Sequence, residues 1–210
     1  MKSRLIGISS YTRDSVYGSI FTIGISIPSY SIECAKKMGV DKYKTLDKKT
    51  LDDLANEVIE SFDFSVTEIK AEDISMGNIN TLEIHNYIHC YNELQRKKNE
   101  IVYARSIGIP PSEIVEKIKL FSKNKIDTSV WTIVDKSNTE CLPCLMSLFL
   151  AKYYYDFYLD DIKKKYSTMG AGKPSSKRTR EYLRTNMYKY PSFVRINYEL
   201  INECGIRLIM

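Results

Sequence analysis

The sequence has few of the residues that interrupt regular structure. Only 9 of its 210 residues are glycine and 6 are proline, which excludes collagen-like chains and Gly/Pro-rich low-complexity chains. With 43% hydrophobic and 27% charged residues, it also differs from disordered chains, which have too little apolar surface to form a core. A chain of this length is sufficient for one folded domain.

Long apolar segments are also missing. The longest apolar run, residues 142–151, is about ten residues long, which is too short to cross a bilayer. The first ten residues, MKSRLIGISS, lack the apolar core of a secretory signal peptide. We therefore expect a soluble, cytoplasmic protein with no membrane partner.

Cysteine is scarce and scattered. The five cysteines are an odd number, and their wide spacing disfavours a secreted disulfide framework. Cys141 and Cys144 form a single CxxC pair. Structural zinc requires a second pair of ligands, and redox chemistry requires a suitable helix N-terminus. The apolar neighbours of the pair favour a place in the core instead.

Acidic residues are nearly absent from one part of the chain. The whole protein is only mildly basic, with 31 Lys and Arg, 26 Asp and Glu, and a net charge of +5. Residues 163–195, however, contain ten basic residues and one acid, Glu181. This asymmetry indicates a polyanion partner near the C-terminal end, although a solvated helical face has the same composition.

Hydrophobic periodicity predicts strands that alternate with helices. Strands rich in β-branched residues are expected at 3–12, 16–28, 62–69, 101–103 and 129–134, the first two joined as a hairpin. Helices are expected at 31–38, 48–61, 80–96, from 110, and from 141 onward with an interruption at 170–174. This order predicts an α/β domain with a mixed sheet, whose chemistry lies at strand ends.

Several short motifs occur in an order typical of one family. The most specific is GAGKPSSKRTREYL at 170–183, which resembles the glycine-rich motif G-S-G-Y-P-S-D-P-R-T-R. The other matches are Gly39-Val40 with Lys44 to G-V-x-D-S-K, Asn80 to Glu83 to N-E-L-E, Ala151-Lys152 with Asp156 to A-K-V-T-R-D, and Pro191, Val194 and Arg195 to P-P-I-V-R. Together these motifs resemble ribonuclease HII, and more closely its archaeal-type branch.

The resemblance implies a ribonuclease H-like fold, in which a mixed five-stranded sheet is flanked by helices and followed by a C-terminal helical extension. On this basis residues 1–165 form the ribonuclease H-like domain. Residues 166–210 form a helical segment that carries the basic glycine-rich motif and packs on the same domain.

The resemblance also implies a chemistry. Family members hydrolyse the RNA strand beside a ribonucleotide in duplex DNA, and they use divalent metal held by four carboxylates. In this chain those four positions are Ser9, Ser10, Ala104 and Asn138. A hydroxyl or an amide contributes no charge that would hold two cations close together. We therefore expect a family member without catalytic residues and without a metal cofactor.

Other acids offer an alternative to this expectation. Asp14, Asp135 and Asp156 lie within or beside the matching motifs. A rearranged site built from them would bind Mg²⁺ or Mn²⁺. The protein would then be a divergent ribonuclease that acts on RNA–DNA hybrids.

Basic residues are kept or gained where the family contacts its substrate. The nucleic-acid contacts expected from the resemblance are Arg13, Lys44, Lys173, Ser175, Arg178 and Arg180. Further lysines expected on the same face are Lys42, Lys136, Lys152 and Lys177. The tyrosine of the glycine-rich motif is Lys173 here, so this face gains positive charge for phosphates and loses a stacking surface.

Two further groups of residues have simpler explanations. His85 and His89 lie four residues apart on a predicted helix, a spacing that metal ligands use, but no carboxylate or further histidine completes the set. The aromatic residues at 153–155, Phe157 and Tyr158 are of the kind that stacks on bases or contacts a protein partner. Their place within a helix favours packing.

The sequence thus predicts a catalytically inactive ribonuclease HII-like protein that binds duplex nucleic acid or an RNA–DNA hybrid without cleaving it. The first alternative is the divergent metal-dependent ribonuclease. The second is a structural subunit of a nucleic-acid-processing complex, which uses a protein partner. The oligomeric state stays open in all three cases.

Overall fold

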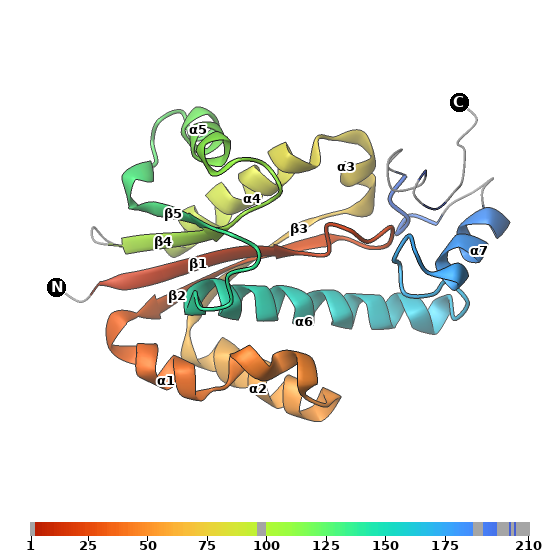
Figure 1. The fold of residues 1–210 in the computed structure, drawn as a ribbon, viewed down its shortest axis with the longest axis horizontal. Helices are drawn as coiled ribbons and strands as arrows, with labels where there is room; N and C mark the ends of the chain where they lie inside the picture. Colours follow the sequence, from red (N-terminus) through yellow and green to blue (C-terminus); the bar gives the residue numbers. More distant parts are fainter. Residues whose placement is uncertain (1–2, 96–99, 187–190, 197–201, 203, 205–210) are drawn as a thin grey trace.

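The fold is built on a five-stranded sheet (Figure 1). The computed structural model describes residues 3–95, 100–186, 191–196, 202 and 204. The strands are β1 (Arg4–Tyr11), β2 (Ile20–Pro28), β3 (Asp63–Ile69), β4 (Glu100–Arg105) and β5 (Trp131–Val134), in the order β3-β2-β1-β4-β5. β2 runs antiparallel to β1 and β3, whereas β4 runs parallel to β1 and to β5. The mixed sheet predicted from the sequence is confirmed.

The parallel pair of β1 and β4 brings two strand ends together. Ile8 lies opposite Ala104 in the register, so Ser9 and Ser10 follow at the same edge of the sheet as Arg105. Open α/β sheets place functional side chains at the carboxyl ends of their parallel strands. This edge therefore positions the candidate site.

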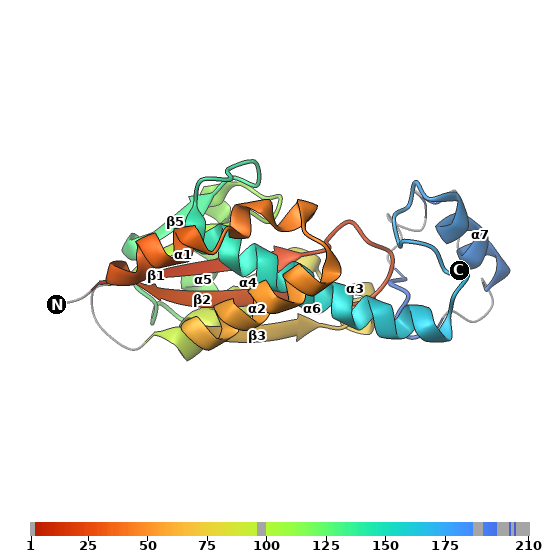
Figure 2. The ribbon, with the colours of Figure 1, turned by 90° about the horizontal axis from the view of Figure 1, so that it is seen from below.

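Helices cover both faces of the sheet. They are α1 (Ile32–Lys37), α2 (Lys48–Ser61), α3 (Ala71–Met76), α4 (Ile79–Leu94), α5 (Pro111–Phe121), α6 (Leu142–Lys165) and α7 (Lys177–Thr185). Figure 1 and Figure 2 show α4 and α5 on one face and α1, α2 and α6 on the other, with α7 beyond the end of α6. Within the part of the chain that the structure describes, no helix is long and apolar enough to cross a membrane.

The residue pattern of β2 explains how both faces are filled. Ile23 and Ile25 lie fully buried in the cluster that includes α6. Gly24 faces α4, where an added Cβ would lie 2.8 Å from the Leu94 side chain and 2.9 Å from Cys90. Large residues thus alternate with a residue that has no side chain, which lets α4 lie close to the strand. Eight of the nine β2 residues are buried, because helices cover both sides of the strand.

Side-chain caps set where three helices begin. The Asp47 carboxylate accepts the Thr50 amide at 3.0 Å before α2, and the Asn78 side chain accepts two amides before α4. The Ser176 hydroxyl accepts the Thr179 amide at 3.4 Å before α7. Such caps satisfy amides that have no partner within the helix.

The predicted strand from residue 16 is wrong in its first four residues. The amides of Val16 and Gly18 donate to the carbonyls of Gly172 (2.8 Å) and Phe193 (2.7 Å). Gly18 has a left-handed backbone with φ +76°. The segment therefore pairs with the C-terminal part of the chain, and β2 begins only after it.

Other differences concern short elements and helix ends. The sequence did not predict α3 or the 3₁₀ segments Ser29–Ser31, Val40–Thr45 and Thr128–Val130, which are too short to produce a periodic pattern. The break between α6 and α7 spans 166–176, longer than the predicted 170–174. Residues 96, 187–190 and most of the chain after 196 belong to predicted helices but lie outside the described residues.

Replacing Gly7 with alanine should destabilise the fold. A Cβ at Gly7 would lie 2.1 Å from the Pro143 carbonyl oxygen, because the first turn of α6 lies directly on β1. Overpacking of a core typically costs about 1–3 kcal/mol, and we expect Gly7→Ala to reach at least the upper part of this range in the free energy of unfolding, measured with denaturant.

Gly39→Ala is the matched control for this variant. Gly39 has φ +73° but nothing within 4 Å of an added Cβ, so its replacement brings only backbone strain of about 1 kcal/mol. Equal losses in the two variants would contradict the close approach of α6 to β1.

Candidate nucleic-acid interface

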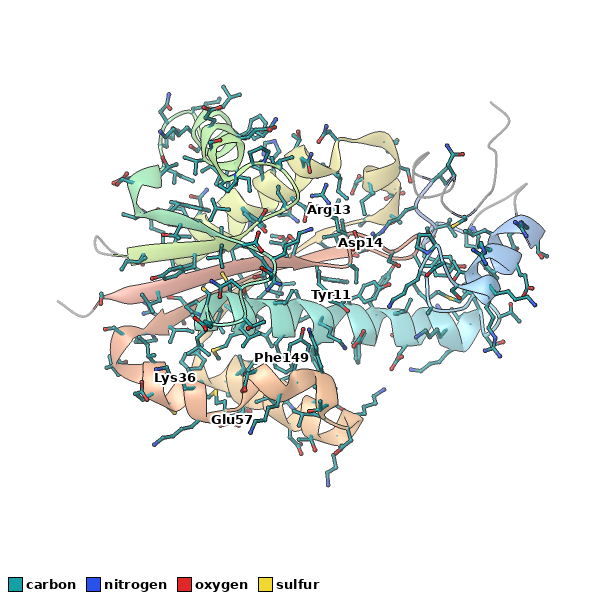
Figure 3. All side chains as sticks on the ribbon, in the orientation of Figure 1. Tyr11, Arg13, Asp14, Lys36, Glu57 and Phe149 are labelled. Carbon is teal, nitrogen blue, oxygen red and sulfur yellow. The ribbon has the colours of Figure 1, made fainter. Side chains whose placement is uncertain are left out.

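A cleft of about 880 Å³ opens at the carboxyl ends of β1 and β4. It is lined by the turn after β1, the 3₁₀ segment Val40–Thr45, the middle of α6 and residues 171 and 173. Figure 3 labels three of its residues, with Tyr11 at the end of β1 and Arg13 and Asp14 in the turn that follows. The cleft lies where the sequence predicted the chemistry.

Two of the four positions that the resemblance aligns with the family's carboxylates belong to the core. Ser9 is fully buried, where its hydroxyl donates to the Cys144 carbonyl at 2.9 Å and accepts from the Ser147 hydroxyl at 2.8 Å. Ala104 is also fully buried. Ser9 therefore contributes to packing between the sheet and α6, and Ala104 to packing between the sheet and the face covered by α4 and α5.

The other two positions make local hydrogen bonds. The Ser10 and Thr22 hydroxyls share a hydrogen bond of 2.9 Å across β1 and β2. The Asn138 side-chain oxygen accepts the amides of Glu140 (2.8 Å) and Cys141 (3.3 Å) in the turn before α6. Asparagine used in this way stabilises a turn.

These four positions do not fit a pair of divalent cations. Mg²⁺ and Mn²⁺ require several hard oxygen ligands, and carboxylate charge is needed to keep two cations close together. No such charge is supplied by the two serine hydroxyls or the alanine methyl group at these positions. The asparagine side-chain oxygen is also uncharged, and it already accepts two backbone amides. No reaction step through a metal follows from these residues.

The three alternative acids do not gather into a metal site. Among residues 3–95, 100–186 and the short described segments after them, no group of three or more His, Cys, Asp or Glu could hold a metal ion. Asp156 is ion-paired with Lys152, and Asp135 accepts the Ser137 amide at 2.8 Å. Asp14 is exposed and lines the cleft.

The sequence analysis missed the buried acid of the cleft, Glu83. It is 1% exposed on α4, and its carboxylate accepts from the Arg13 guanidinium at 2.6 Å. Burial raises the pKa of Glu83, and the charge of Arg13 opposes this effect. Arg13 also donates to the Asn80 side chain (2.6 Å) and to the Ile107 carbonyl. The match of Asn80 and Glu83 to N-E-L-E was the signal for this contact.

Arg13 therefore has a structural role within the cleft. Its guanidinium hydrogen-bonds to three protein acceptors and fastens the turn after β1 to α4. The sequence predicted Arg13 as a nucleic-acid contact. The side chain does line the cleft, but its charge is compensated by Glu83.

The residues predicted to contact nucleic acid fall into two groups. Those that line the cleft are Arg13, Lys44, Lys136, Lys152 and Lys173. Those that lie outside it, near or on α7 or in the 3₁₀ segment, are Ser175, Lys177, Arg178, Arg180 and Lys42. The structure thus brings the first group together around one cavity and leaves the second apart from it.

Two further basic residues line the cleft without having been predicted. Arg105 ends β4 directly after Ala104, and Lys163 lies near the end of α6. Arg105 could have been predicted from the sequence as a cleft residue, because it follows the predicted site position Ala104. Predicting Lys163 as a cleft residue requires knowing how far α6 extends past the sheet. In total seven basic and three acidic side chains line the cleft.

The aromatic and histidine groups are explained mainly by packing. Tyr155 is buried and makes an edge contact with Tyr11 at 5.7 Å between ring centroids. Phe157 is the exception, with 67% exposure. The His85 ring stacks on the Phe121 ring at 4.7 Å.

Comparison with known proteins places this fold and cleft in a family. The family model for Ribonuclease HII matches residues 6–201. The chain belongs to the ribonuclease HII family.

Relatives within ribonuclease HII share about a quarter of their residues with this chain. The ribonuclease HII of Thermococcus onnurineus is 26% identical over 212 residues, which cover 98% of this chain and 91% of that protein. The ribonuclease HII of Pyrococcus abyssi is 25% identical, covering 90% and 84%. Family membership supports a ribonuclease function and carries no information on loss of activity.

Solved structures of the family and its relatives have the same fold. The ribonuclease H2 of Pyrococcus horikoshii OT3 has a TM-score of 0.81 at 23% identity, covering 96% of both chains. The PCNA:RNase HII complex from Archaeoglobus fulgidus contains a chain with a TM-score of 0.77 at 21% identity, covering 92% and 94%. Bst-RNase HIII in complex with Mn²⁺ has a TM-score of 0.77 at 9% identity, covering 97% and 70%. The ribonuclease H-like fold is confirmed.

Replacing Arg13 should lower the free energy of unfolding at neutral pH, because the buried Glu83 carboxylate then lacks an opposite charge. Because the pKa of Glu83 is raised, the folded state holds this proton more tightly than the unfolded chain. The free energy of unfolding therefore falls as pH rises from the ordinary Glu pKa through the folded-state pKa. Arg13→Met removes the opposing charge and should steepen this fall, with a loss of roughly 3 kcal/mol at neutral pH.

Denaturant unfolding from mildly acidic to neutral pH measures this effect. Adding Glu83→Gln to Arg13→Met should recover part of the stability at neutral pH and flatten the profile. Lys36→Met, which breaks an exposed ion pair on α1, should leave the profile unchanged. A flat profile in Arg13→Met alone would contradict the assigned role of the ion pair.

Proposed function

We propose that this ribonuclease HII family member binds nucleic acid through the cleft and does not cleave it. The observation that carries the proposal is the set of cleft side chains that have no ion-pair partner among the described residues: Lys44, Arg105, Lys136, Lys163 and Lys173. They line the cleft together with Ser10, one of the four positions that the resemblance aligns with the family's carboxylates.

The two changes have one electrostatic consequence. In an active relative, bound metal cations compensate the phosphates and the carboxylates compensate the cations. Here the carboxylates are absent and lysines line the cleft, so the positive charge is covalently part of the protein. Lysine neutralises phosphate as a point charge without providing a nucleophile or polarising a water molecule. Binding is therefore retained in this proposal while hydrolysis is lost.

The ligand that we propose is a duplex, either DNA or an RNA–DNA hybrid. Lys173 replaces the aromatic residue of the glycine-rich motif, which removes a stacking surface from the cleft. Discrimination of ribose from deoxyribose should be weak for that reason. Gel-shift experiments with DNA duplex, RNA–DNA hybrid and single strands give the order of preference.

A divergent ribonuclease remains the second candidate, favoured by family membership. Asp14 is the observation in its support, because this exposed acid lines the cleft close in sequence to Ser9 and Ser10. Such an enzyme would use Mg²⁺ or Mn²⁺.

A protein partner is the third candidate. An aromatic groove of about 660 Å³ includes Phe21, Tyr158 and Phe193, and the exposed Phe157 lies at it. Exposed aromatic groups are typical of protein interfaces. Co-purification with one stoichiometric protein, together with nucleic-acid binding that is insensitive to salt, would favour this candidate.

Removing two cleft lysines should weaken duplex binding. Each phosphate contact contributes a slope of about −0.9 in log K against log salt, so Lys44→Gln with Lys173→Gln should reduce the slope by about 1.8. The affinity at moderate salt should fall roughly tenfold, measured by fluorescence anisotropy over a salt series.

The matched control is Lys36→Gln with Lys37→Gln. It changes the net charge equally but acts on α1, away from the cleft, as Lys36 shows in Figure 3. Its effect on affinity and slope should be small. Equal effects from both double variants would mean that net charge and not the cleft governs binding.

A cleavage assay separates the first two candidates. With Mg²⁺ or Mn²⁺, a DNA duplex that contains one ribonucleotide should be recovered intact, while the ribonuclease HII of Thermococcus onnurineus serves as the positive control. Cleavage that disappears in Asp14→Asn or Asp156→Asn would overturn the non-cleaving function and support the divergent enzyme.

A further inference from the structure

The N-terminus of α6 carries two cysteines one helical turn apart. Cys141 precedes the helix with a non-helical backbone, and Cys144 lies within its first turn. The Leu145 amide donates to the Cys141 carbonyl at 2.9 Å, which closes this turn. The Cys141 and Cys144 side chains hydrogen-bond to each other, so the two sulfur atoms lie side by side at this turn.

The two cysteines differ in accessibility. Cys141 is partly exposed, whereas Cys144 is 1% exposed and its sulfur lies 3.3 Å from the Tyr103 carbonyl oxygen. Both are free thiols in this structure. A dithiol exchange site requires an exposed thiol that reacts with the external reagent. It also requires a buried thiol that is accessible to the first thiol but not to the reagent.

The first turn of α6 is held firmly in place. Its backbone lies against β1, where only glycine fits at position 7, and the Ser9 hydroxyl donates to the Cys144 carbonyl. The inner cysteine therefore cannot move away from the turn that carries Cys141. This constraint favours reaction between the two sulfur atoms over reaction of Cys144 with an external molecule.

We propose that Cys141 and Cys144 form a thiol–disulfide exchange site that reacts with low-molecular-weight disulfides such as glutathione disulfide. The Cys141 thiolate attacks one sulfur of the reagent, forms a mixed disulfide and releases one glutathione thiolate. Cys144 then loses its proton to solvent and attacks the Cys141 sulfur, which releases the second glutathione. Two protein thiols are oxidised to one disulfide, and the reagent is reduced to two thiols.

The surrounding charges support this order of events. Hydrogen bonding with the Cys144 side chain, together with the charge of Arg105, lowers the pKa of Cys141 to about 7, although burial opposes this effect. The pKa of Cys144 is raised, first by its hydrogen bond with Cys141 and then by burial. Once Cys141 is in a mixed disulfide, it has no thiolate charge, and its hydrogen bond no longer raises the pKa of Cys144. Cys144 is thus a poor first nucleophile that becomes competent after Cys141 has reacted.

Mass spectrometry of the full-length protein after treatment with glutathione disulfide tests the proposal. The wild type should lose two hydrogens and yield a peptide pair joined through Cys141 and Cys144, and dithiothreitol should reverse the change. Cys144→Ser should stop at a mixed disulfide of Cys141 with glutathione. Cys141→Ser should leave Cys144 unmodified while the protein remains folded.

Cys34 on α1 is the internal control, because it is exposed and has no cysteine partner among the described residues. Cys141 should react with iodoacetamide roughly tenfold faster than Cys34 at neutral pH, because the lowered pKa of Cys141 favours its thiolate. A wild-type protein that keeps glutathione on Cys141 with Cys144 as a free thiol would overturn the proposal. Modification of Cys34 with Cys141 unchanged would overturn it as well.

Discussion

The architecture of the cleft depends on one buried guanidinium. Arg195 is fully buried, and it donates to the carbonyls of Thr12 (2.6 Å), Gly18 (2.6 Å) and Ser19 (3.0 Å). Burial lowers the pKa of Arg195 to about 10, which leaves the side chain charged at neutral pH. Charge-assisted hydrogen bonds to carbonyl oxygens offset the cost of removing this charge from water. They fasten the C-terminal segment to the turn after β1.

That connection brings distant parts of the chain to one cavity. The turn held by Arg195 positions Arg13 beside Glu83 on α4. The Val16 amide, just after this turn, donates to the Gly172 carbonyl, which holds the segment that carries Lys173 against it. The basic residues of the cleft come from the turn after β1, the 3₁₀ segment Val40–Thr45, β4, the loop after β5, α6 and this C-terminal segment. The four positions that the resemblance aligns with the family's carboxylates have different contacts. Ser9 hydrogen-bonds to α6, and Ser10 to Thr22 on β2. Ala104 lies in the core cluster that includes α4 and α5, and Asn138 stabilises the turn before α6. The five-stranded scaffold is thus present, and seven basic side chains line the cleft at its edge.

Local patterns predicted the elements that are determined locally. The β-branched residues of β1 and β2, the helical periodicity of α2 and α4, and the proline at the start of α5 all predicted their elements correctly. Motif order predicted the fold and the family, and it located the strand edge at which Ser10 and Ala104 lie. These features depend on residues close together in sequence or on a pattern shared with relatives.

Features that depend on distant partners were not accessible from the sequence. Residues 16–19 have the composition of a strand, but their backbone groups pair with Gly172, Phe193 and Arg195, which lie far away in the sequence. Arg13 was interpreted as a phosphate contact because its partner Glu83 lies 70 residues away. The basic residues of α7 were predicted as contacts because they lie in the same motif as Lys173, and they are not among the residues that line the cleft. A charge pattern predicts that the protein has a basic face, but it does not predict which residues lie on that face.

The central claim is that fixed lysine charge has replaced metal in holding nucleic acid. Duplex affinity measured by fluorescence anisotropy in Mn²⁺ and in EDTA, at equal ionic strength and with strand integrity checked in the same samples, tests it most directly. The account predicts the same affinity in both conditions and intact strands throughout. Binding that requires Mn²⁺, or strands that are cut only when Mn²⁺ is present, would contradict it.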